Sequence, residues 1–196
     1  GGPRLLGKRA DGSFGPAAAV LHLPYLLLSL GVWHLAAAAR GSRDASLVAP
    51  GLWVGRRPRP SDVPADVTTV VDLTAELPAR RAVRRRGAYV AFPILDGHVP
   101  PTPALVALAR RLAADPGVVY VHCAQGHGRA GLVAACVLVA RGLAADPAGA
   151  VRLMRFARPK VRLTRSQSRR LKEVVAVLRP SGTRRQDGRP PSPGSA

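Results

Sequence analysis

The sequence predicts an α/β fold in which a central, mostly parallel sheet is flanked by helices, with a further hydrophobic helix near the N-terminus. Two observations predict the sheet. Short apolar runs rich in β-branched residues, typical of buried parallel strands, alternate with segments of helical pattern. One such run, residues 117–121, leads through a glycine-containing loop directly into an apolar helical segment over residues 132–141. Because ligands of such sheets bind beyond the carboxyl ends of the strands, we expect the functional site at this loop.

The chain divides into four parts by composition. Residues 1–15 are polar, basic and glycine-rich, and we expect them to form a flexible arm. Residues 16–40 are expected to form one hydrophobic helix, since residues 16–39 carry no formal charge. Residues 45–179 contain the alternating strands and helices of the expected domain. Residues 180–196 are rich in Pro, Gly, Ser and Arg, which is typical of a disordered tail.

The hydrophobic helix is predicted to be a membrane anchor. Its uncharged stretch is longer than the roughly 20 residues that a helix needs to cross a bilayer, and Tyr25 and Trp33 would suit the interfaces. Two other interpretations stay open: a signal peptide ending near residues 37–39, or a helix packed on the domain. Arginines are more frequent after the stretch than before it, which favours a membrane-associated protein with its domain in the cytoplasm. The alternative is a soluble cytoplasmic protein.

Turn and capping residues mark the elements of the domain in order. The expected strands cover residues 46–48, 52–55, 68–73, 88–92 and 117–121, and the expected helices cover residues 79–86, 101–114, 132–141, 146–156 and 165–178. Pro50 and Gly51 form the turn of the first hairpin. Thr102 and Thr164 are the expected N-caps of their helices, and Asp146 with Pro147 opens another.

The loop after the strand at residues 117–121 is suited to bind a phosphate-sized dianion. A loop that joins a strand to a helix N-terminus can turn several backbone N–H groups toward one point, where the helix dipole adds positive potential. Glycines let the backbone close around the anion without Cβ clashes. The expected phosphate-binding residues are Ala124, Gln125, Gly126, His127, Gly128 and Arg129.

Two side chains of this loop indicate what happens to the anion. Cys123 stands where the strand ends, so the same N–H groups and the helix dipole should stabilise its thiolate, which is a competent nucleophile. Arg129 follows six positions later, where the helix begins. Its planar guanidinium can hold two phosphoryl oxygens and stabilise the charge that develops on them.

The sequence His122-Cys123, five residues and Arg129 resembles the signature of the cysteine-dependent protein tyrosine phosphatase superfamily. Residues 47–178 are similar to its dual-specificity branch, in a bacterial type with an N-terminal hydrophobic segment. The resemblance implies a phosphatase that hydrolyses phosphate monoesters of tyrosine, serine and threonine in proteins. The alternatives are a phospholipid phosphatase, acting on phosphoinositide or phosphatidylglycerophosphate, and a phosphate-binding pseudophosphatase.

The resemblance also implies roles for residues outside the loop. Asp96 follows a strand and a proline at the place where the family carries its general acid, although an Asp-Gly turn is the simpler interpretation; His98 is a weaker alternative. His122 would position Cys123 through hydrogen bonds. Gln167 matches a glutamine that orients water near the phosphatase site, or else is a surface amide on a helix.

The implied reaction passes through a cysteinyl-phosphate and uses neither a metal nor another cofactor. Ala130 departs from the family pattern, because a Ser or Thr normally follows the arginine and its hydroxyl stabilises the departing thiolate. We therefore expect slow breakdown of the phospho-enzyme.

The charge, the aromatic content and the number of cysteines indicate which classes of partner the chain favours. A net charge of +19 favours acidic partners, namely nucleic acid, anionic lipid or phosphorylated substrates. Aromatic residues make up only 4% and do not interleave with basic ones, so there is no specific signal for nucleic acid. Cys123 and Cys136 are the two cysteines, too few for a disulfide framework. A free thiolate suits a reducing compartment.

Overall fold

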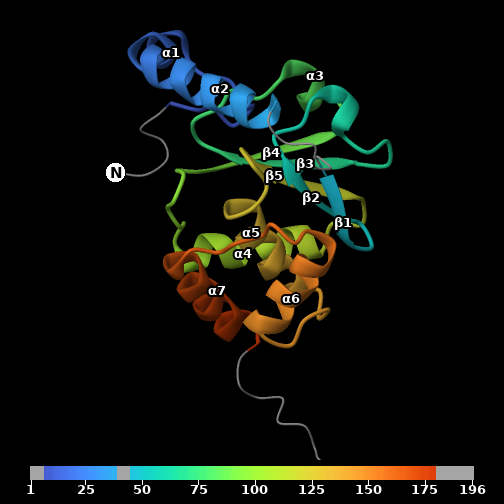
Figure 1. Cartoon of the computed structure of the whole chain (residues 1–196). Coiled ribbons are helices and arrows are strands. Elements are labelled where there is room, and N and C mark those ends of the chain that lie inside the picture. Colours follow the sequence, from blue (N-terminus) through green and yellow to red (C-terminus); the bar gives the residue numbers. More distant parts are fainter. Residues whose placement is uncertain (1–6, 39–44, 180–196) are drawn as a thin grey trace, which may run out of the picture.

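A five-stranded sheet forms the centre of the computed structural model, which describes residues 7–38 and 45–179 (Figure 1). Its spatial order is β1-β2-β5-β3-β4. Strand β5 pairs in parallel with β2 on one side and β3 on the other, β4 is parallel to β3, and β1 alone is antiparallel, to β2. The strands are β1 (Ala45–Ala49), β2 (Leu52–Arg56), β3 (Thr69–Thr74), β4 (Ala88–Ile94) and β5 (Val119–Cys123). The prediction of an α/β fold with a mostly parallel central sheet is confirmed.

Four helices cover one face of the sheet, and the main core lies between them and the strands (Figure 1). They are α4 (Thr102–Ala113), α5 (Arg129–Ala140), α6 (Pro147–Ala157) and α7 (Arg165–Leu178). Helix α5 is buried over all but its last residue, which fits its uninterrupted apolar sequence. A smaller cluster that includes Val70 and Tyr120 is covered on the opposite face by α3 (Arg81–Arg84) and by the chain around the 3₁₀ helix η2 (Pro60–Asp62).

Two of the three predicted helix starts are formed as expected. The Asp146 carboxylate accepts the Gly149 N–H at 2.7 Å at the start of α6. The Thr164 hydroxyl accepts the Gln167 N–H, and the Gln167 side chain accepts the Thr164 N–H in return, so α7 begins with a capping box. Thr102 is not an N-cap: Pro101 takes that place, and the Thr102 hydroxyl bonds Glu173 of α7 at 2.8 Å instead.

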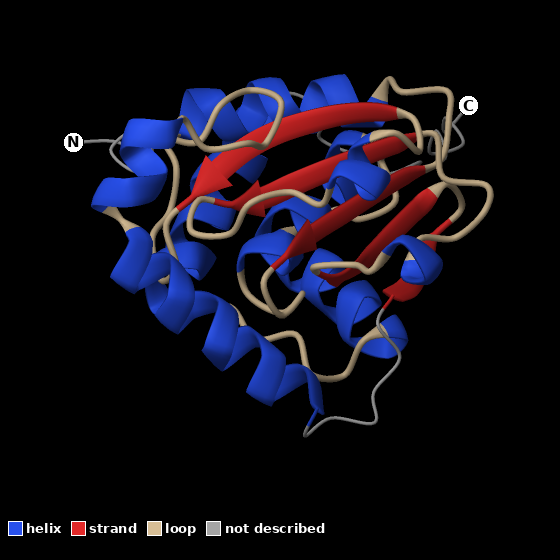
Figure 2. Cartoon of the chain, turned by 90° about the horizontal axis from the view of Figure 1, so that it is seen from above, coloured by secondary structure: helices blue, strands red, loops and turns tan. Residues whose placement is uncertain are grey.

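The hydrophobic segment forms two helices rather than the single one expected over residues 16–40. These are α1 (Pro16–Leu21) and α2 (Leu23–Ala38), with His22 between them. The break falls just before Pro24, whose nitrogen has no hydrogen to donate to the preceding turn. Of the helices in residues 7–38 and 45–179, none combines the length and apolar content needed to cross a bilayer, unlike the membrane-spanning anchor that we expected. Both helices lie across the carboxyl ends of the parallel strands (Figure 2).

Part of the arm expected to be flexible is packed on the domain. The Lys8 ammonium is buried and donates to the Asp72 carboxylate at 2.7 Å and to the Thr74 and Leu77 carbonyls at 2.6 and 2.7 Å. A buried ammonium needs such acceptors, and β3 and the loop after it supply them. Residues 1–6, the short linker at 41–44 and the predicted tail at 180–196 lie outside the described residues.

Candidate active site

The loop between β5 and α5 folds back on the cysteine that precedes it. Gly126 has φ +73° and donates its N–H to the Cys123 sulfur at 3.1 Å. A Cβ at Gly126 would lie only 2.3 Å from the carbonyl carbon of Gly55 in β2, so the position requires glycine on two counts. Helix α5 begins at Arg129, and no side chain caps its first turn. The first backbone N–H groups of the helix, which follow the loop directly, therefore have no side-chain acceptor at the cap position.

Arg158 holds the loop from the side away from the sulfur, a role that the sequence analysis missed. Its Nε donates to the Gly126 carbonyl at 2.8 Å and its Nη2 to the Gln125 carbonyl at 3.3 Å. These bonds hold the two loop carbonyls toward Arg158. The N–H side of the loop therefore points away from Arg158, as anion binding requires. Arg158 stands just before Pro159, far from the loop in the sequence, and no motif pointed to it.

The Arg129 guanidinium is held by a second residue that the sequence analysis missed, Glu76. Nη1 and Nη2 donate to the two Glu76 oxygens at 2.8 and 2.7 Å, and Nη1 also donates to the Ile94 carbonyl at 2.8 Å. Burial alone would lower the pKa of Arg129, but the Glu76 hydrogen bonds and the charges of Cys123, Glu76 and Asp96 outweigh it and raise that pKa. Arg129 therefore stays charged. Its Nε is buried and has no hydrogen-bond partner among the described residues.

Asp96 lies on the turn after β4 and reaches the same guanidinium. Its Oδ1 is 3.2 Å from Arg129 Nη2, and its side chain is 80% exposed. The turn continues through Gly97 at φ +73° and is closed by the His98 N–H bonding the Leu95 carbonyl at 3.0 Å. The strand β4 and the Asp-Gly turn together place this carboxyl at the entrance of the site.

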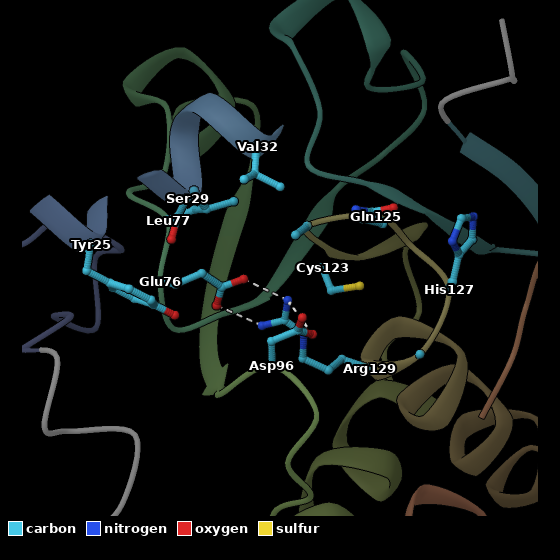
Figure 3. A pocket seen from close by; sticks show the side chains of 12 residues that line it. Tyr25, Ser29, Val32, Glu76, Leu77, Asp96, Cys123, Gln125, His127 and Arg129 are labelled. Atoms are coloured by element: carbon cyan, nitrogen blue, oxygen red, sulfur yellow. Dashed lines mark hydrogen bonds and ion pairs between the residues drawn. The ribbon is translucent and has the colours of Figure 1, made fainter. Parts of the chain in front are cut away.

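One pocket of about 320 Å³ brings these groups together (Figure 3). Cys123, Arg129 and Asp96 line it, together with the loop residues Ala124, Gln125, His127 and Gly128. The opposite wall comes from helix α2 and the loop after β3 (Figure 3). That wall consists of Tyr25, Ser29, Val32, Glu76 and Leu77. The sequence analysis did not anticipate any contribution from the hydrophobic segment.

His122 lies on the other face of the sheet from this pocket, since neighbouring residues of a strand point to opposite faces. Its ring is buried beside Tyr120, and its Nδ1 lies 3.9 Å from Asp72 Oδ1. Burial lowers the pKa of His122 to about 4, against the opposing effects of the Asp72 charge and a hydrogen bond to the Cys123 backbone. His122 is therefore neutral near pH 7, and its contact with the cysteine is the hydrogen bond to the Cys123 backbone.

Gln167 is buried next to the loop, not exposed on a helix surface. A Cβ at Gly128 would lie 3.2 Å from its Oε1, but Gln167 is not among the residues that line the pocket. Its amide completes the capping box of α7. Within the described ranges, no three His, Cys, Asp or Glu side chains are grouped so as to hold a metal ion.

Residues 46–176 match a family described as the DSP-PTPase phosphatase domain of Swiss Army Knife proteins. The chain belongs to this family. The matched residues comprise the whole sheet except Ala45, all four covering helices except the last two residues of α7, and the loop from Cys123 to Arg129. The chain is therefore a DSP-PTPase phosphatase domain, and the resemblance to the dual-specificity branch of the superfamily is confirmed.

Solved structures of other phosphatases share the fold of this DSP-PTPase domain. Tk-PTP in its active form is 28% identical, with a TM-score of 0.59 over 67% of this chain and 96% of that chain. Human DUSP28 is 22% identical, with a TM-score of 0.58 over 70% and 96% of the two chains. PTPMT1 in complex with PI(5)P is 17% identical, with a TM-score of 0.61 over 69% and 96%. No curated protein matches the chain significantly.

Proposed function

We propose that this DSP-PTPase domain hydrolyses phosphate monoesters through a cysteinyl-phosphate formed on Cys123. One observation carries the proposal: Cys123 and Arg129 line the same pocket, and the buried Arg129 Nε has no hydrogen-bond partner among the described residues. A buried donor without a partner is costly, and a phosphoryl oxygen between the sulfur and the guanidinium would supply the missing acceptor.

The first step transfers the phosphoryl group to sulfur. The Cys123 thiolate attacks phosphorus, an S–P bond forms and the P–O bond to the leaving group breaks. Arg129 and the loop N–H groups stabilise the equatorial oxygens as charge develops on them. Asp96, protonated, gives its proton to the leaving oxygen.

The second step returns the enzyme to its starting state. A water molecule attacks phosphorus and gives its proton to the Asp96 carboxylate. The S–P bond breaks, and inorganic phosphate and the Cys123 thiolate are released. The residues used are those of the chain itself, so the proposal invokes no metal or cofactor.

Phosphorylated proteins are the first proposed substrates. The loop carries Gln125 and His127 where lysines would favour the multiple charges of a phosphorylated lipid headgroup. A lipid phosphomonoester is the second, and a specific observation favours it: Tyr25, Ser29 and Val32 of an exposed apolar helix form part of the pocket wall.

A matched pair of cysteine variants tests the proposed function. Phosphotyrosine and phosphothreonine peptides are offered to the full chain, to Cys123→Ser and to Cys136→Ser. Cys136 is also buried but lies within α5, outside the pocket, and burial raises its pKa to about 12, so it has no nucleophilic role. We expect Cys123→Ser to abolish hydrolysis and the covalent phosphate trapped by acid quenching, and Cys136→Ser to retain both. Hydrolysis that survives in Cys123→Ser would overturn the proposal, and phosphopeptide binding without hydrolysis by the parent chain would indicate a pseudophosphatase.

A further inference from the structure

Helix α2 carries an apolar surface that the domain does not cover. Leu21, just before it, and Leu27, Leu28 and Leu35 on it are each more than half exposed, whereas Leu26 is buried. A helix that is apolar on all sides is normally enclosed on all sides, by protein or by lipid. Exposed apolar patches of this kind mark sites of interaction with a protein or a membrane.

The exposed face of α2 lies beside the face that lines the active-site pocket. Tyr25, Ser29 and Val32 are spaced by four and three residues, so they form one stripe along the helix, and all three line the pocket (Figure 3). Leu28 and Leu35 are one heptad apart and lie on the adjoining stripe, open to solvent. Whatever covers the leucines is therefore brought next to the entrance of the pocket.

The chemistry of this surface fits a bilayer better than a folded protein. No described residue from Pro16 to Ala38 carries a formal charge, so the helix offers a protein partner no ionic groups to orient it. The acyl region of a bilayer needs no ionic groups to accept an apolar helix face. Helix α3 lies on the same side of the sheet as α2 (Figure 1). It begins with the exposed Arg81 and is followed by the exposed Arg85, and these arginines would contact anionic headgroups while the leucines enter the acyl region.

We propose that α2 lies in the interface of an anionic phospholipid bilayer, and that the pocket beside it takes the phosphomonoester headgroup of a lipid in that bilayer. A helix in this position sits at the level of the headgroups, and it would present Cys123 and Arg129 to a phosphate held at the same depth. This inference rests on the proposed phosphatase function and names its substrate class. It differs from a membrane-spanning anchor, because only one side of the helix enters the lipid.

Vesicle binding tests the docking surface without relying on activity. The full chain is sedimented with phosphatidylcholine vesicles with and without phosphatidylglycerol, together with the triple variant Leu27→Ser, Leu28→Ser, Leu35→Ser. The control is Leu153→Ser with Phe156→Ser on α6, which removes exposed apolar side chains from the opposite side of the sheet. We expect binding to the anionic vesicles, a loss of at least about tenfold in the triple variant, and no change in the control or in Cys123→Ser. Absence of binding by the parent chain, an equal loss in the control, or self-association through α2 without vesicle binding would each overturn the proposal.

Hydrolysis measured in the same variants tests the substrate class. Phosphatidylinositol monophosphate in anionic vesicles, its soluble inositol phosphate headgroup and p-nitrophenyl phosphate are compared. We expect kcat/KM for the vesicle lipid to exceed that for the headgroup, and the triple variant to lose this advantage while keeping its p-nitrophenyl phosphate activity. If the parent chain hydrolyses p-nitrophenyl phosphate but shows no preference for the lipid, the substrate class is refuted and the proposed function stands. If it binds vesicles but hydrolyses none of the three, the proposed function fails and the substrate class fails with it.

Discussion

Arg129 and Glu76 form a bidentate ion pair in the same pocket as the candidate nucleophile, with N–O distances of 2.8 and 2.7 Å and both side chains almost fully buried. The two parallel hydrogen bonds fix the plane of the guanidinium. Among the described residues, the Glu76 carboxylate accepts hydrogen bonds from Arg129 and from the Ala75 N–H, and not from Cys123. We therefore interpret Glu76 as a residue that positions Arg129 and takes no direct part in the chemistry.

Replacement of Glu76 by Gln should lower kcat/KM by about 10–100-fold, because Arg129 would lose one charged acceptor and with it the orientation of the fork. Glu76→Ala should also destabilise the fold by up to about 3–5 kcal/mol, since among the described residues it leaves the buried guanidinium only the exposed Asp96 carboxylate, at 3.2 Å, as an ion-pair partner. Steady-state kinetics and denaturant unfolding measure the two effects. Glu173→Gln, which removes the exposed partner of Arg170 on α7, is the matched control and should change neither. Unaltered kinetics in Glu76→Gln would show that the pair has no positioning role.

Gly126→Ala should abolish activity and lower the free energy of unfolding by several kcal/mol. The added Cβ would collide with the backbone of Gly55 and Arg56, at 2.3–2.6 Å, in addition to the strain of φ +73°. Gly142→Ala provides the control, because Gly142 has the same φ but nothing within 4 Å of the added Cβ. That variant should cost only about 1 kcal/mol and keep full activity. Equal effects of the two substitutions would refute the close approach of the loop to β2.

Buried His122 should make the domain less stable as the pH falls from about 6.5 to about 4. In the unfolded chain histidine takes up a proton near pH 6.5, whereas in the folded domain His122 does so only near pH 4. Unfolding therefore takes up a proton within this window, and acid favours the unfolded state by up to about 3 kcal/mol. Chemical unfolding at a series of pH values should show a smaller slope for His122→Asn than for the parent chain. An unchanged slope would place the acid sensitivity elsewhere.

Asp96→Asn should slow hydrolysis of alkyl phosphates by about 10²–10⁴-fold, the usual contribution of a general acid. The effect on p-nitrophenyl phosphate should be much smaller, because that leaving group departs without a proton. The ratio of the two effects separates proton donation from a contribution of Asp96 to the position of Arg129, which would affect both substrates alike. Asp62→Asn, a partly buried carboxylate on η2 that does not line the pocket, should leave both rates unchanged.

Because residue 130 is an alanine, we expect hydrolysis of the cysteinyl-phosphate, the second step, to limit the rate. The residue is fully buried at the second position of α5 and has no hydroxyl to stabilise the Cys123 thiolate as it leaves phosphorus. Rapid mixing should show a burst of product followed by slow turnover, and Ala130→Ser should raise the slow rate. Linear product formation together with no gain in the serine variant would contradict this expectation.

Local sequence determined most of the domain. Apolar β-branched runs identified the strands, because a strand buried on both faces needs apolar side chains on each. The observed ends differ from the expected ones by one or two residues at most. Asp146 and Thr164 marked their helix starts because each supplies an acceptor to the first turn. The spacing of Cys123 and Arg129 identified the anion loop, since both lie in one short strand–loop–helix unit whose geometry depends on neighbouring residues.

Tertiary structure decided what reaches that loop from a distance along the chain. Glu76 binds Arg129 across 53 residues, and Arg158 binds the Gly126 carbonyl across 32. Neither residue has a distinctive sequence signal, because a buried ion pair is defined by where two side chains meet and not by their spacing. Lys8 and helix α2 are the clearest cases: by composition they belong to a basic arm and a hydrophobic segment, and only the fold places one against Asp72 and the other beside Cys123.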